Sequence, residues 1–262
     1  MTTSRSIAGR VVLVTGANRG LGAALVDAAI ARGAAKVYAG TRDTARYAEG
    51  AATRSGHVIP VRLDVTDDGD VARARETLTD VDILISNAGL TYMVPLAETT
   101  LEGARATMEA NYFGPLRLVQ AFGELLEERR GAFISILSIA GVLAAGNAEL
   151  YSASKAAGKM LGHAVAFARP GIAVSLVYPG LMDTDMMGGS ALPKTPTTAI
   201  AARTFDAWSR GEVAIFPDRH AELVEQCLLS DPAGTLRAPH GLFRTALDAF
   251  VAERGLQREE PA

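Results

Sequence analysis

The sequence is poor in the residues that mark secreted, membrane-bound or metal-binding proteins. It has one cysteine, Cys227, so no disulfide can form within the chain, and this fits a reducing, cytoplasmic compartment. Its four histidines show no ligand spacing with one another or with Cys227, and we assign no metal. The longest uncharged stretch, 133–148, is interrupted by glycines and falls short of a membrane span. The first six residues lack the apolar core of a secretory signal.

A large excess of charge is also missing. The 262 residues carry a formal net charge of −3, which argues against a nucleic acid or an anionic membrane as partner. Hydrophobic residues make up 48% and charged residues 21%, the ordinary balance of a globular protein. With no internal repeat or low-complexity linker, we expect one domain over residues 1–262.

Short apolar runs alternate with helical patterns through the first 180 residues. This alternation predicts an α/β fold, with a parallel sheet covered by helices on both faces. The predicted strands are 11–14, 36–40, 58–63, 81–85, 133–137 and 172–177, with a seventh edge strand over 211–216. Residues 99–128 have helical spacing, and Pro115 in this stretch predicts a bend of the helix axis.

A glycine-rich turn separates the first strand from the first helix. Glycines there allow a tight turn and let a pyrophosphate approach the helix amino end. A plain strand–helix connection is the alternative, but the flanking elements favour a dinucleotide site. The residues assigned to it are Gly16, Asn18, Arg19, Gly20, Leu21 and Gly22.

The end of the second strand bears on the choice of dinucleotide. In a dinucleotide-binding fold this position reads the adenosine ribose. Arg42 there, with Arg19 from the glycine turn, could pair with a 2′-phosphate, which favours NADPH. The adjacent Asp43 leaves an alternative open, because a carboxylate facing the ribose would also accept NADH.

Two further strand ends carry residues suited to a nucleotide. Asp64 and Val65 follow the third strand, where the carboxylate could accept from an adenine amino group or cap the next helix. Asn87, Ala88 and Gly89 follow the fourth strand, and small residues there suit a backbone passing beneath a cofactor.

Tyr151 and Lys155 are spaced for one face of a helix, and Ser138 closes a buried strand upstream. An ammonium one turn away favours the phenolate, so Lys155 is expected to lower the pKa of Tyr151 towards the range of an acid–base catalyst. Asn111 lies near the bend at Pro115. It is either a surface side chain or one beside a carbonyl or water position that the bend opens.

The alternation of strand-like and helix-like stretches ends after the sixth strand. Met182, Met186 and Met187 with nearby glycines suggest a substrate lid over about 181–210, although an ordinary connecting loop is the alternative. Two helices, at about 219–229 and 243–254, form the predicted C-terminal helical segment. The small residues on the helix that begins near Tyr151 suggest that this helix also forms a subunit interface.

Together these motifs resemble the short-chain dehydrogenase/reductases in their short, single-domain form. The resemblance covers about residues 8–190. The matching residues are Thr15, Gly16, Gly20, Gly22, Asp64, Asn87, Ala88, Gly89, Asn111, Ser138, Tyr151, Lys155, Pro179, Gly180 and Thr184. The resemblance implies a three-layer Rossmann fold whose doubly wound parallel seven-stranded sheet has the order 3-2-1-4-5-6-7. It also implies hydride transfer between a nicotinamide and a carbonyl or alcohol carbon.

The resemblance also implies a role for each site residue. Ser138 would hydrogen-bond the substrate oxygen and Tyr151 would transfer the proton. Lys155 would hold the nicotinamide ribose, and Asn111 would support a water leading away from the lysine. Thr184 would touch the nicotinamide carboxamide, beside Pro179 and Gly180 in the cofactor site.

Our interpretation is an NADPH-dependent reductase of a hydrophobic ketone or aldehyde, reversible as an alcohol dehydrogenase. The Arg19 and Arg42 pattern is similar to that of NADPH-preferring carbonyl reductases in this family, with NAD(H) still possible. A cofactor-binding sensor with little turnover is the alternative, and halohydrin dehalogenation is disfavoured because that chemistry replaces Lys155 by arginine. The family's frequent Val-Asp-Gly-Gly ending is absent, which makes a tetramer doubtful and leaves a homodimer through the helices of Asn111 and Tyr151.

Overall fold

One parallel sheet runs through the protein. The computed structural model describes residues 5–45, 47, 57–184 and 192–255, and the seven strands follow the order β3-β2-β1-β4-β5-β6-β7. The strands are β1 (Val11–Thr15), β2 (Lys36–Thr41), β3 (Val58–Arg62), β4 (Ile83–Ser86), β5 (Ala132–Ile136), β6 (Ala173–Val177) and β7 (Ala214–Ile215). The expected α/β fold and strand order are confirmed.

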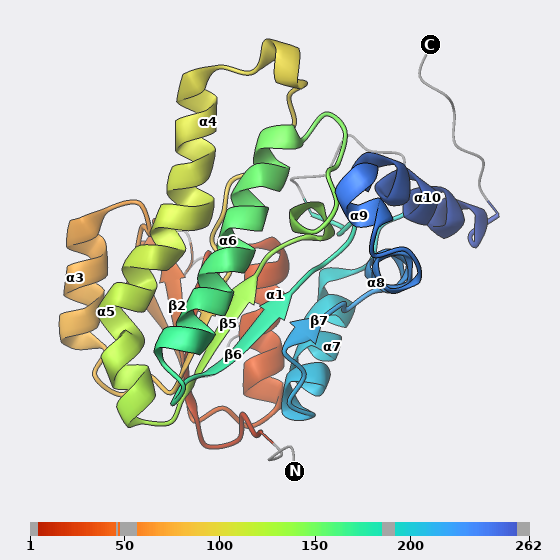
Figure 1. The fold of residues 1–262 in the computed structure, drawn as a ribbon. Coiled ribbons are helices and arrows are strands. Elements are labelled where there is room, and N and C mark those ends of the chain that lie inside the picture. Colours follow the sequence, from red (N-terminus) through yellow and green to blue (C-terminus); the bar gives the residue numbers. More distant parts are fainter. Residues whose placement is uncertain (1–4, 46, 48–56, 185–191, 256–262) are drawn as a thin grey trace.

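Helices cover both faces of this sheet. Figure 1 shows α5 and α6 on the near face, with α1 and α7 on the far face. The helices are α1 (Gly20–Ala31), α3 (Asp68–Thr77), α4 (Leu101–Met108), α5 (Gly114–Glu128), α6 (Glu149–Ala168), α7 (Thr197–Ser209), α8 (Arg219–Ser230), α9 (Gly234–Arg237) and α10 (Pro239–Ala252). Among the described residues, no helix combines the length and apolar character needed to cross a bilayer.

The central strands are buried on both faces because helices pack on each side. In β1, Val12 and Val14 belong to the apolar cluster under α1 and α7, while Leu13 belongs to the cluster under α3, α5 and α6. All three are fully buried. Successive strand residues point to opposite faces, so one apolar run supplies both cores.

The strand order reverses at β1, which lies between β2 and β4. The chain leaves β1 towards β2 and β3, and then returns to place β4 on the other side. In open α/β sheets such a reversal leaves a crevice at the carboxyl ends of the strands, where ligands bind.

The long helical stretch before β5 bends at a π turn. Glu109–Phe113 form this turn between α4 and α5, and Pro115 lies in the first turn of α5. Because the backbone is helical from α4 through Phe113 into α5, Pro115 removes one helical hydrogen bond to the preceding turn, and the wide π turn lies where that bond is missing. The bend predicted from Pro115 is present, but it takes the form of the preceding wide turn.

Part of the range predicted as a substrate lid, 181–210, is a helix packed in the core. Thr197–Ser209 form α7, whose Ile200, Phe205 and Trp208 are buried in the core against α1. The apolar spacing of this helix was overlooked because prolines and methionines precede it. Met186 and Met187 lie outside the described residues. The seventh strand is only Ala214–Ile215, narrower than the predicted 211–216.

Candidate active site

A cleft of about 490 Å³ opens at the carboxyl edge of the sheet. Almost every residue assigned to the cofactor from the sequence lines it. These are Gly16, Asn18, Arg19, Gly20, Leu21, Gly22, Arg42, Asp64, Val65, Asn87, Ala88, Gly89, Tyr151, Lys155 and Thr184. Pro179 and Gly180 do not line the cleft, but their loop lies directly behind Ser138, since Ile139 N–H donates to the Pro179 carbonyl at 3.1 Å.

The glycine turn has the shape that a pyrophosphate requires. Gly16 and Gly20 have φ of +66° and +56°, which side chains rarely allow. A Cβ on Gly22 would lie 2.1 Å from the Gly16 carbonyl oxygen, so the turn and α1 touch with no space for one. The backbone at the amino end of α1 is therefore left accessible from the cleft, and these residues fit a bound dinucleotide phosphate.

Thr15 joins the glycine turn to the loop after β4. Its Oγ1 accepts from the backbone N–H groups of Asn87 and Ala88, each at 3.0 Å. The Asn87 amide donates back to the Thr15 carbonyl at 2.9 Å. The two loops thus form one rigid floor of the cleft.

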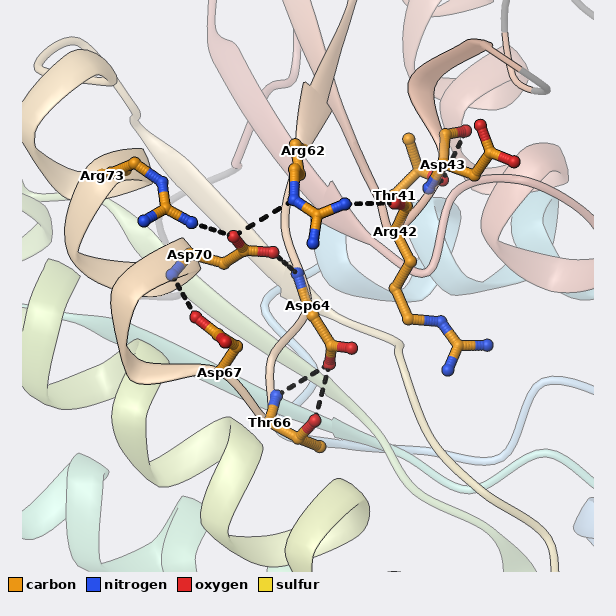
Figure 2. Close-up of polar contacts among 9 residues, drawn as sticks. All are labelled: Thr41, Arg42, Asp43, Arg62, Asp64, Thr66, Asp67, Asp70 and Arg73. Carbon is orange, nitrogen blue, oxygen red and sulfur yellow. Dashed lines mark hydrogen bonds and ion pairs between the residues drawn. The ribbon is translucent and has the colours of Figure 1, made fainter.

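At the outer end of the cleft, Arg42 and Asp43 diverge. Figure 2 shows the Arg42 side chain extending towards Asp64 and the Asp43 carboxylate pointing the opposite way. Arg42 lines the cleft and Asp43 does not. Asp64 lines the cleft, and its Oδ1 accepts from Thr66 N at 3.0 Å and Thr66 Oγ1 at 2.8 Å. It does not cap the next helix, because the N-cap of α3 is Asp67.

The side chains of Ser138 and Thr91 lie beside the Tyr151 hydroxyl. Burial raises the pKa of Tyr151 to about 12, although both neighbouring side chains act to lower it. The sequence predicted a pKa below the ordinary value through Lys155. The structure reverses this direction, because the loss of solvation outweighs the stabilisation of the phenolate.

Lys155 lies one turn along α6 and lines the same cleft. Its Nζ donates to the Ile136 carbonyl at 3.0 Å and is 5.7 Å from the centroid of the Tyr151 ring. The side chain is 6% exposed, and burial lowers the pKa of Lys155 to about 8. The lysine can therefore exchange a proton close to neutral pH.

Asn111 is buried in the π turn and is not a surface residue. Its side chain hydrogen-bonds the backbone of Leu90 and the hydroxyl of Ser154, and it does not line the cleft. In this arrangement the amide supports the cleft from behind.

Thr91 and Ser154 are two site residues that the sequence did not reveal. Thr91 lies two residues after Gly89, in the loop that follows β4. A hydroxyl in this loop could have marked Thr91 as a candidate site residue. Ser154 lies between Tyr151 and Lys155, and its place in the motif gives no hint that it is fully buried. Its partner Asn111 comes from a distant part of the chain.

Comparison with known proteins identifies the fold family. The family model described as short chain dehydrogenase matches residues 10–193. The chain belongs to the short-chain dehydrogenase/reductase family. It is accordingly an NAD(P)-dependent oxidoreductase that acts on CH–OH or carbonyl groups.

Relatives within this family differ in substrate. The chain is 35% identical to cis-4-hydroxycyclohexanecarboxylate dehydrogenase of Sinomonas cyclohexanicum, over 76% of this chain and 82% of that protein. It is 31% identical to 3-oxoacyl-(acyl-carrier-protein) reductase of Escherichia coli K12, over 68% and 75%. A short-chain dehydrogenase of Burkholderia cenocepacia J2315, solved with NADP, superposes with a TM-score of 0.81 at 37% identity, covering 94% of this chain and 98% of that one.

Proposed function

We propose that this short-chain dehydrogenase/reductase uses NADP(H) to interconvert a ketone or aldehyde and its alcohol, with Tyr151 as proton donor and acceptor. The observation that carries the proposal is that Tyr151 and Lys155 line the same cleft, with Ser138 beside the Tyr151 hydroxyl. A hydroxyl and a phenol held together suit a substrate oxygen that gains or loses a proton.

Each residue has a chemical task in this proposal. A bound nicotinamide would give or take the hydride at the carbon. Ser138 would bind the substrate oxygen, and Tyr151 would hold or release the proton at that oxygen. Lys155, with its pKa lowered by burial to about 8, would hold the ribose and favour the phenolate when it is charged. Asn111 supports the loop of Thr91 and thereby the position of the phenol.

The preference for NADP(H) is supported by the direction of Arg42. Arg42 and Arg19 line the outer end of the cleft, where a 2′-phosphate would lie, while Asp43 points elsewhere. The Burkholderia cenocepacia relative was solved with NADP. Arg42→Ala should raise the KM for NADPH about ten- to a hundredfold and that for NADH far less. Equal effects on both cofactors would contradict the assignment.

The reaction itself is tested with purified protein, NADPH and a panel of carbonyl compounds. Consumption of NADPH should be followed by its absorbance, with Tyr151→Phe as the control. Activity at the level of this variant with every compound would contradict the proposal. Tight NADPH binding without turnover would instead favour the cofactor-binding sensor.

A hydrophobic substrate is supported by apolar residues in the wall of the cleft. Leu90, Leu137 and Met182 line the cleft. The panel should pair cyclohexanone with 4-oxocyclohexanecarboxylate, because these differ in one charged group. We expect a higher kcat/KM for the neutral ketone, since nothing in an apolar wall compensates a desolvated carboxylate.

We further propose that the protein is a homodimer and is located in the cytoplasm. Phe113 at the π turn and Met160 and Phe167 on α6 are 42%, 62% and 91% exposed. Exposed apolar side chains on neighbouring elements suit a subunit contact. Light scattering should give a dimer for the wild type and a smaller species for Phe167→Lys combined with Met160→Lys.

A further inference from the structure

Asp70 is a buried carboxylate beside the cleft that does not line it. It lies in the first turn of α3 and is 1% exposed. Its backbone N–H donates to Oδ1 of the N-cap residue Asp67 at 2.7 Å, which holds this turn in place. No step of the proposed reaction uses Asp70.

The two oxygens of Asp70 bind two residues at the end of β3. Oδ2 accepts from the backbone N–H of Asp64 at 3.1 Å, and Oδ1 accepts from Nε of Arg62 at 3.3 Å (Figure 2). Arg73, one turn along α3, also donates to Oδ1. Burial alone would raise the pKa of Asp70, but the Asp64 N–H and both guanidinium groups outweigh it and leave this pKa below its ordinary value.

Arg62 extends this contact to β2. Its NH1 donates to the backbone carbonyl of Arg42 at 3.0 Å, while its Nε remains on Asp70. Arg62 itself does not line the cleft, whereas Arg42 and Asp64 do. One buried carboxylate therefore reaches both residues that face the adenosine end of the cleft, and it does so through backbone groups.

The carbonyl that Arg62 binds belongs to the peptide between Arg42 and Asp43. This peptide joins Arg42, which lines the cleft, to Asp43, which does not, and Figure 2 shows their side chains pointing in opposite directions. On the other side, Asp43 N–H donates to Thr41 Oγ1 at 3.2 Å. The sheet cannot fix this orientation alone, because β3 is an edge strand with β2 as its one neighbour.

We propose that Asp70 and Arg62 form a positioning pair that sets the preference for NADP(H) over NAD(H) by holding the Arg42 peptide and Asp64 in place. This rests on the cofactor preference proposed above. A guanidinium is suited to this task, since its planar fork can donate to two acceptors at once. A lysine keeps the positive charge but cannot reach both acceptors in the same geometry.

The test measures dissociation constants for NADPH and NADH by fluorescence titration of the full chain. The variants are Asp70→Asn, Arg62→Lys and Arg62→Leu, with Arg73→Gln as the matched control. Arg73 touches Asp70 but neither Arg42 nor Asp64. We expect the first three to reduce the ratio of the NADH to the NADPH constant by about fivefold, the effect of one lost hydrogen bond. Arg73→Gln should leave the ratio unchanged.

The outcomes separate the pair from the proposed function. A wild type that binds both nucleotides equally contradicts the NADP(H) preference, and the pair with it. A wild type that prefers NADPH, with variants that keep the ratio and only lose thermal stability, overturns the pair alone. The proposal would also be overturned if Arg62→Lys kept the wild-type ratio of the two dissociation constants while Arg62→Leu lowered it. The positive charge at position 62, and not the placement of the Arg42 peptide, would then explain the preference. Since the Arg62 side chain is 66% exposed, its variants carry the test even if Asp70→Asn does not fold.

Discussion

The side chain of Asn111 binds both polar groups of the Leu90 backbone. Leu90 N–H donates to Oδ1 and the Leu90 carbonyl accepts from Nδ2, each at 2.8 Å. Nδ2 also donates to Ser154 Oγ at 2.9 Å, and that hydroxyl donates to the Tyr151 carbonyl at 2.7 Å. One amide thus joins the loop after β4 to α6, so the position of Thr91 relative to the phenol depends on it.

Replacing Asn111 by leucine should be costly for this reason. Asn111→Leu leaves both polar groups of Leu90 without their partner and should reduce the free energy of unfolding by about 3 kcal/mol or more. Ser154→Ala removes a smaller part of the network and should cost about 1 kcal/mol. Urea denaturation of both variants measures these two losses in the free energy of unfolding and shows which is larger. Equal losses would mean that the Leu90 contacts add nothing to stability.

Thr91→Val tests the second hydroxyl beside Tyr151. Valine has nearly the shape of threonine but no hydroxyl, so a hydrogen bond that lowers the pKa of Tyr151 is lost. We expect kcat to fall about fivefold and the pH–rate profile to move to higher pH. Thr91→Ser should restore both. A profile that stays in place in Thr91→Val would show that the contact has no role in proton transfer.

The glycine turn should not tolerate one methyl group. A Cβ at position 22 would lie 2.1 Å from Gly16 O and 2.7 Å from Asn87 Nδ2, so the floor of the cleft must move. Gly22→Ala should cost about 2 kcal/mol or more in stability and abolish NADPH binding in a fluorescence titration. The control is Gly241→Ala on α10, where the nearest atom is 3.8 Å away. That variant should bind NADPH normally.

His220 should make stability depend on pH. The side chain is fully buried, its ring stacks on Phe250 with centroids 4.9 Å apart, and neither ring nitrogen has a hydrogen-bond partner within the described residues. Burial, helped by the charge of Arg254, lowers the pKa of His220 from 6.5 to about 4.

Because this folded-state pKa lies below the unfolded value, the unfolded chain takes up the proton first as pH falls. The contribution of neutral His220 to the free energy of unfolding is constant above about pH 6.5. It is lost as the pH falls from that value to pH 4, and the loss is about 3 kcal/mol in total. His220→Phe keeps the stacking and removes the titration. Urea unfolding of both proteins at several pH values should give curves that diverge below pH 6.5. Parallel curves would contradict the role of His220.

Local sequence patterns were enough to predict the sheet and the floor of the cleft. The strand β1 and the glycine turn after it are specified by residues that are adjacent in the sequence, so a short stretch is enough to predict both. The same holds for Tyr151 and Lys155, whose spacing places them on one face of α6.

Contacts between residues that are far apart in the sequence could not be predicted in this way. Asn111 meets Leu90 and Ser154 only after α4, α5 and α6 have packed. Pro115 predicted a bend near Asn111 but not the π turn that presents its side chain. The pKa of Tyr151 was predicted in the wrong direction because burial, which the spacing does not reveal, is the largest contribution. The helix α7 lies within the range predicted as a lid, and its apolar face packs against α1, a contact that neighbouring residues in the sequence do not reveal.

Asp218 links the part of the chain beyond the family match to the part within it. It is fully buried in front of α8, and its Oδ2 accepts from the Gly180 N–H at 2.8 Å, although the family match ends at residue 193. A chimera that joined residues 1–193 to the C-terminal part of another family member would keep every matched residue. It would still lose the acceptor for Gly180 unless the new part supplied a carboxylate there. The C-terminal part of this protein therefore cannot be exchanged as an independent unit without a replacement for this contact.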